Sequence, residues 1–161
     1  MLVLAGLAVA GVAAVALALL FAQPAGEGEQ GELLTVGLVD DYAVGSVTEV
    51  GAGRFFLVRT SDEEFVALSW VDSHLRGCKV PWRPDFEFAG PNPIREGTGW
   101  FRDGCSGSTY DKLGRLVSGP SPRDLDCYVV TLRGDEVSVD TGAYVCGWAP
   151  PGASCLETTI D

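Results

Sequence analysis

From Leu33 onward, the apolar residues of this chain fall into short runs in which they alternate with polar residues, and turn residues separate these runs. Successive side chains of a β-strand point to opposite faces, so this alternation is typical of strands. After residue 33, no stretch keeps the 3.6-residue apolar period of an amphipathic helix over about ten positions. The pattern therefore predicts an all-β fold class, a small antiparallel β domain with a C-terminal extension over residues 33–161.

Two pairs of these runs carry hairpin signals. The segments "DCYVVTL" (126–132) and "EVSVD" (136–140) flank the turn "RGDE". The segments "RFFLVRT" (54–60) and "EFVALSW" (64–70) flank a similar turn at "TSDE". Glycine favours turns because it adopts positive φ without steric cost, and aspartate and serine favour them because their side chains form hydrogen bonds with the turn backbone. We therefore predict a hairpin at each of the two turns.

Residues 1–22 form an apolar segment without a charged or strongly polar side chain. As a helix, this segment would extend roughly 33 Å at 1.5 Å per residue, which matches the hydrocarbon core of a bilayer. A cleaved signal peptide would have a basic start and a shorter apolar core. We therefore predict a single N-terminal transmembrane helix that is retained as an anchor, with a cleaved signal as the alternative.

Residues 23–32 are polar, glycine-rich and acidic, so they cannot bury enough surface to order themselves and are predicted to form a flexible tether. A cysteine-containing domain after an apolar segment fits export, which places the expected domain on the non-cytoplasmic side of the membrane. The net charge of −11 comes from 22 Asp and Glu against 11 Lys and Arg. Nucleic acid is excluded as a partner because phosphate binding needs a basic face.

The chain has five cysteines, so at least one is unpaired within the chain. Their spread, together with a single histidine, excludes a compact zinc site. Cys146 and Cys155 are close in sequence, and this proximity alone suggests a disulfide between them. Cys127 lies inside a predicted strand and is interpreted as a small buried apolar side chain.

Two segments, "DSHLRGCKVPW" (72–82) and "DGCSGSTYDKLGRLVSGPSPRDLD" (103–126), resemble the two cluster-binding loops of the Rieske iron–sulfur family. In that family the first loop reads C-x-H-L-G-C followed by V-P-W, and the second reads C-P-C-H-G-S-x-Y-D with G-P-x-P downstream. The matching residues are His74, Leu75, Gly77, Cys78, Val80, Pro81, Trp82, Cys105, Gly107, Ser108, Tyr110, Asp111, Gly119, Pro120 and Pro122. The resemblance is strongest to the quinol-oxidising branch, of the cytochrome bc and b6f type.

Apart from one extra residue in the first loop, Arg76, and a longer connection between the loops, the departures from this family lie at the ligand positions. A Rieske [2Fe–2S] cluster needs two thiolates and two imidazoles. The four matching positions hold Asp72, His74, Asp103 and Ser106, so only His74 is a ligand of the expected type. The resemblance therefore implies a degenerate member of the family, with no cofactor, no metal and no catalytic residue.

Two alternatives to an empty site stay open. One is a [2Fe–2S] cluster that the substituted residues still hold. The other is a single transition metal ion bound by Asp72, His74 and Asp103, whose carboxylates and imidazole suit non-haem iron, manganese or zinc. Aspartates in turns also commonly accept backbone N–H bonds, which explains them without a metal. Asp103, Ser106 and Ser108 are expected to hold the second loop by such local hydrogen bonds.

Cys78 and Cys105 match the positions of a disulfide that joins the two loops in the quinol-oxidising branch, so the resemblance implies a Cys78–Cys105 bridge. It also implies a membrane-anchored subunit with a structural or docking role in a respiratory or photosynthetic redox complex, beside cytochrome b-type subunits. We expect a non-catalytic subunit of an oxidoreductase complex. The alternatives are an electron-transfer protein or oxidoreductase that binds a metal between the loops, and a thiol-based redox module that uses Cys127 or the bridge.

Overall fold

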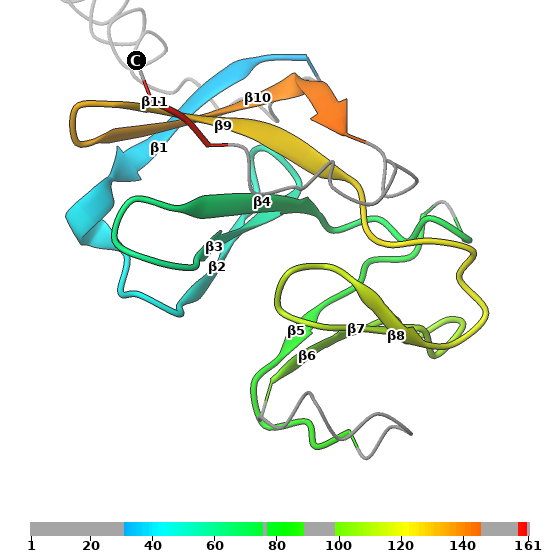
Figure 1. The fold of residues 1–161 in the computed structure, drawn as a ribbon. Helices are drawn as coiled ribbons and strands as arrows, with labels where there is room; N and C mark the ends of the chain where they lie inside the picture. The colour runs from blue at the N-terminus through cyan, green and yellow to red at the C-terminus, as the bar shows by residue number, and fades with distance from the viewer. Residues whose placement is uncertain (1–30, 76, 89–98, 146–157, 161) are drawn as a thin grey trace, which may run out of the picture.

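The computed structural model describes residues 31–75, 77–88, 99–145 and 158–160 (Figure 1). These residues form strands, with one short 3-10 helix, η1 (Val39–Asp41). The described part contains no helix that is long and apolar enough to cross a membrane. The predicted anchor at 1–22 and nearly all of the predicted tether at 23–32 lie outside the described residues. The all-β fold class is confirmed for the described residues.

The larger part of the domain is a seven-stranded sheet in the order β1-β10-β9-β4-β3-β2, with β11 pairing β9. The pairings are antiparallel except for the parallel pairing of β11 with β9. Its strands are β1 (Leu33–Leu38), β2 (Val47–Val50), β3 (Phe55–Arg59), β4 (Phe65–Ser69), β9 (Cys127–Arg133), β10 (Glu136–Val145) and β11 (Thr158–Ile160).

Both predicted hairpins are confirmed. Strands β9 and β10 pair from Arg133 opposite Glu136, around a turn in which Gly134 has a φ of +61°. Strands β3 and β4 pair from Arg59 opposite Phe65, across the "TSDE" segment. The turn chemistry therefore fixed where these strands reverse.

The central strands β3 and β4 are buried on both faces. Phe55 and Leu57 pack in one apolar cluster with residues of β9 and β10, whereas Phe56 and Val58 pack in a second cluster that includes the smaller sheet. The same alternation holds along β4. Burial on both faces explains why these two segments read as nearly continuous apolar runs.

A smaller four-stranded sheet in the order β5-β6-β7-β8 lies against the second cluster, in the lower part of Figure 1. Its strands are β5 (Trp82–Arg83), β6 (Trp100–Arg102), β7 (Thr109–Tyr110) and β8 (Leu116–Ser118). The rings of Phe56 and Phe101, 5.1 Å apart between centroids, join the two sheets. This sheet positions the two loops of interest, because the first loop (72–78) connects β4 to β5 and the second loop (103–108) connects β6 to β7.

Candidate functional site

The first loop is closed by the carboxylate of its own first residue. Oδ1 of Asp72 accepts hydrogen bonds from the backbone N–H of His74 at 2.5 Å and of Leu75 at 3.0 Å. The N–H of Asp72 donates to the carbonyl of Cys78 at 3.0 Å, across the base of the loop. Asp72 is buried, whereas His74 and Leu75 are exposed at the tip. Asp72 thus serves as the internal acceptor that shapes the loop.

The second loop uses the same device. Oδ1 of Asp103 accepts the N–H of Cys105 at 2.8 Å, and Oδ2 accepts both the N–H of Ser106 at 2.7 Å and the Ser106 hydroxyl. The N–H of Asp103 donates to the carbonyl of Ser108 at 2.9 Å and closes the loop. The local hydrogen bonds expected of this loop are confirmed. Two aspartates at matching loop positions therefore perform matching structural roles.

These hydrogen bonds act on the charge of Asp103. Burial of its carboxyl raises the pKa, but the hydrogen bonds from Ser106 and Cys105 lower it, as does the charge of His74. The result is a pKa of Asp103 below its ordinary value. Asp103 is therefore ionised at neutral pH although its side chain is buried.

A third segment (119–122), which follows β8, packs closely on the second loop. A Cβ atom on Gly119 would lie 2.4 Å from the Cα of Ser108, and the φ of Gly119 is +114°. The N–H of Ser121 donates to the Ser108 hydroxyl oxygen at 3.1 Å. The glycine is required because no side chain fits between these two backbones.

A chain of hydroxyl groups joins the three segments. The hydroxyls of Ser106 and Ser108 are 2.9 Å apart, and those of Ser73 and Ser121 are 2.7 Å apart. With the bond from Ser121 N–H to Ser108, this series runs from the second loop through the third segment to the first loop. The roles of Ser73 and Ser121 were not predicted. The only signal in the sequence was a serine in each of these turn segments.

Tyr110 on β7 fixes the first loop from inside. Its hydroxyl donates to Oδ2 of Asp72 at 3.0 Å, and both side chains are buried. Burial raises the pKa of Tyr110 to about 12, and the charge of Asp72 acts in the same direction. Both carboxylate oxygens of Asp72 therefore accept hydrogen bonds from the protein.

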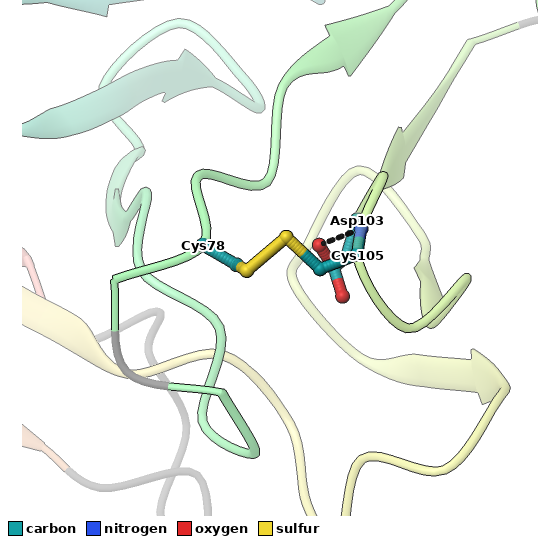
Figure 2. A group of neighbouring side chains, drawn as sticks. All are labelled: Cys78, Asp103 and Cys105. Atoms are coloured by element: carbon teal, nitrogen blue, oxygen red, sulfur yellow. Dashed lines mark hydrogen bonds between the residues drawn. A yellow bond between two sulfur atoms is a disulfide. The ribbon is translucent and has the colours of Figure 1, made fainter.

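The disulfide between Cys78 and Cys105 is confirmed. Their Cα atoms are 6.3 Å apart, and the bond joins the two loops beside the carboxylate of Asp103 (Figure 2). Cys105 is exposed and Cys78 is partly exposed. This bond is a covalent tie between loops that the hydroxyl series joins by hydrogen bonds.

The interpretation of Cys127 from the sequence is a small buried apolar side chain. The side chain is buried, as predicted, but it is disulfide-bonded. Cys146 and Cys155 lie outside the described residues, so a bridge between them stays a prediction.

The described residues contain one group of three potential metal ligands whose donor atoms lie within 4.8 Å of one another, namely Cys78, Asp103 and Cys105. Asp72 and His74 do not form such a group with Asp103 within this part of the chain. The charge of His74 nevertheless acts on Asp103. The fold therefore brings the two loops together, and it places Asp103 beside the sulfur atoms.

Curated proteins that are similar to this chain are iron–sulfur subunits of cytochrome b6-f complexes. The subunit of Synechococcus sp. (strain JA-3-3Ab) is 39% identical over 70 residues, which cover 44% of this chain and 33% of the relative. The subunit of Chlorobaculum thiosulfatiphilum is 27% identical over 111 residues, which cover 63% of this chain and 54% of the relative. The chain thus spans about a third to a half of the length of these relatives. No protein-family model matches the chain.

Proposed function

We propose, from the premise that this chain belongs to the Rieske iron–sulfur family, that it is a cluster-free subunit of a membrane redox complex. Its role in that complex is structural or docking. The relatives are subunits of cytochrome b6-f complexes, so a cytochrome b-type subunit is the proposed partner. The chain is anchored to the membrane by residues 1–22, with its β domain on the non-cytoplasmic side.

One observation carries the proposal that no [2Fe–2S] cluster is bound. Of the four ligand positions only His74 holds a ligand of the expected type, and the carboxylates that replace the thiolates, Asp72 and Asp103, accept backbone hydrogen bonds within their own loops. Ser106, at another ligand position, is bound to Asp103 and Ser108. A [2Fe–2S] cluster takes two thiolates and two imidazoles, and two carboxylates, a hydroxyl and one imidazole do not fit it.

The same bonds support a structural role. In this proposal the disulfide and the hydroxyl series hold the loops where a cluster holds them in the wider family. The loop tip is then presented to a partner in a fixed shape. Leu75 is 40% exposed at that tip, and an exposed apolar side chain is a suitable contact for a protein partner.

Recovery of the full chain from native membranes tests the docking role. A tagged chain is purified in mild detergent, and the copurifying proteins are identified by mass spectrometry. We expect a cytochrome b-type subunit among these proteins, and we expect less of it with Leu75→Asp than with the control Val44→Asp. Val44 is a suitable control because it is also an exposed apolar residue but lies far from the loops in sequence. Recovery of no membrane redox subunit with the wild-type chain would contradict the proposal.

The alternative function is an electron-transfer protein or oxidoreductase that holds a single metal ion through Asp72, His74 and Asp103. The two carboxylates and the imidazole are ligand types that suit non-haem iron, manganese or zinc, although their donor atoms do not form a three-ligand group within the described residues. Elemental analysis of the purified chain separates the two functions. If the purified chain contains stoichiometric metal, and both His74→Ala and Asp72→Asn lose it, the metal-binding function is supported and the structural role is contradicted.

A further inference from the structure

The bond between Cys78 and Cys105 joins two residues that are also metal-ligand types, and it lies beside a third ligand. The two sulfur atoms and a carboxylate oxygen of Asp103 lie within 4.8 Å of one another. Figure 2 shows the carboxylate of Asp103 next to the disulfide, with the N–H of Cys105 donating to it. In the oxidised chain the sulfurs cannot act as thiolate ligands, because they are bonded to each other.

We propose that reduction of this disulfide by a dithiol creates a binding site for a thiophilic divalent cation of the zinc type, with the thiolates of Cys78 and Cys105 and the carboxylate of Asp103 as ligands. This site differs in its ligands from the set Asp72, His74 and Asp103. It also goes beyond the structural role, because it makes the link between the loops responsive to redox conditions.

The site forms in two steps, reduction of the disulfide and then binding of the metal ion. The dithiol transfers two electrons and two protons to the disulfide by way of a mixed disulfide and becomes an intramolecular disulfide itself, which leaves two protein thiols. Zn²⁺ then replaces the two thiol protons, which are released to solvent. Two thiolates, one carboxylate and one water complete a tetrahedral zinc site of the open kind.

The geometry favours Asp103 as the third ligand. Zinc lies at about 2.3 Å from sulfur and about 2.0–2.2 Å from a carboxylate oxygen, so ligand atoms of one site are on the order of 3.5–3.8 Å apart. The Cα atoms of Cys78 and Cys105 are 6.3 Å apart, so after reduction both thiolates stay on adjoining segments beside Asp103. Among the described residues, Oδ1 of Asp103 accepts one hydrogen bond, from Cys105 N–H, and keeps a second lone pair for a metal.

The two basic residues next in sequence to the site, Lys79 and Arg102, contact other groups. Lys79, next to Cys78, forms an ion pair with Glu49 at 2.6 Å and lies over the ring of Trp70. Arg102, next to Asp103, donates to the Thr109 hydroxyl at 2.9 Å and lies over the ring of Phe86. Cys105 is exposed, so a dithiol and a metal ion can reach the sulfur atoms from solvent.

Titration with Co²⁺, which gives thiolate charge-transfer absorption, tests the site. The full chain is reduced with a phosphine, freed of reductant without oxygen, and titrated beside the oxidised chain. We expect one Co²⁺ per reduced chain, displaced by Zn²⁺, and none in the oxidised chain. Asp103→Asn should weaken binding at least about 10- to 100-fold. Cys127→Ser, the matched control for the other disulfide, should leave binding unchanged.

A second measurement on the wild-type chain does not depend on the folding of variants. The reduced chain is alkylated with and without Zn²⁺, and the modified cysteines are mapped by mass spectrometry. Protection of Cys78 and Cys105 by Zn²⁺, with Cys127 still modified, supports the site. Equal alkylation of Cys78 and Cys105 with and without Zn²⁺, or equal Co²⁺ binding by oxidised and reduced chains, would overturn it.

Discussion

The hydroxyl of Tyr110 donates a hydrogen bond to Oδ2 of Asp72 at 3.0 Å, between two side chains that are buried and 38 residues apart in the sequence. The other oxygen of Asp72 accepts the N–H groups of His74 and Leu75. One buried carboxylate therefore joins the tip of the first loop to strand β7. A buried carboxylate is costly unless it is hydrogen-bonded, so the donors of Asp72 are essential to this arrangement.

Removal of this hydroxyl should destabilise the domain. Tyr110→Phe leaves Oδ2 of Asp72 buried without its donor, and we expect a loss of about 1–3 kcal/mol in the free energy of unfolding. Urea denaturation of the two proteins measures this difference. Tyr128→Phe, at another buried tyrosine, is the control and should change stability by less than about 0.5 kcal/mol. Equal midpoints for Tyr110→Phe and wild type would show that the bond has no structural importance.

Alkaline pH should act through the same residue. The pKa of Tyr110 is raised to about 12, whereas an unfolded tyrosine has a pKa near 10. The stability that the neutral phenol contributes is therefore fully present below pH ~10, and it is lost as the pH rises through about 12. We expect unfolding free energies of wild type and Tyr110→Phe to converge over this range. A constant difference between them would contradict the assigned cause.

Acid should destabilise the second loop, because the pKa of Asp103 is lowered whereas that of Tyr110 is raised. The pKa of Asp103 is below its ordinary value, so its contribution is present above the unfolded pKa of about 3.9 and is lost as the pH falls through the folded pKa. Asp103→Asn should cost about 1–3 kcal/mol at neutral pH and flatten the acid dependence of stability. Asp62→Asn, at an exposed aspartate, is the matched control. An unchanged acid profile in Asp103→Asn would exclude this role.

A methyl group at Gly119 should separate the third segment from the second loop. The added Cβ would lie 2.4 Å from the Cα of Ser108, so one backbone must move, and alanine also disfavours the positive φ. We expect Gly119→Ala to lose more stability than Gly45→Ala, which has a φ of +82° but no atom within 4 Å of the added Cβ. Thermal denaturation compares the two. Similar losses in both variants would mean that backbone conformation alone, and not the close approach, matters.

The larger sheet could be predicted from sequence because its signals are local. The apolar runs of β3 and β4, the alternation in β9 and the turn at Gly134 depend on neighbouring residues only. Strands β5 to β8 are two or three residues long, so they carry no readable alternation, and the loops around them set their register. The parallel pairing of β11 with β9 joins distant segments and leaves no local pattern.

Some features of the candidate site could be predicted from the sequence and others could not. The Cys78–Cys105 bond followed from a family resemblance, and the hydrogen bonds of Asp103 followed from the turn preference of aspartate. The link between Ser73 and Ser121 could not be predicted, since it depends on how closely the third segment approaches Ser108. The metal hypothesis combined Asp72, His74 and Asp103, whereas the structure groups Asp103 with Cys78 and Cys105.

Iron and acid-labile sulfide analysis, together with electron paramagnetic resonance after dithionite reduction, tests the proposed loss of the cluster most directly. The full chain is produced in a host that assembles iron–sulfur clusters. A triple variant, Asp72→Cys, Asp103→Cys and Ser106→His, restores the ligand set of two thiolates and two imidazoles and serves as the positive control. We expect no Rieske-type signal and no bound sulfide in the native chain, and a gain of both in the variant. A Rieske-type signal from the native chain, with about two iron atoms per chain, would contradict the proposed function.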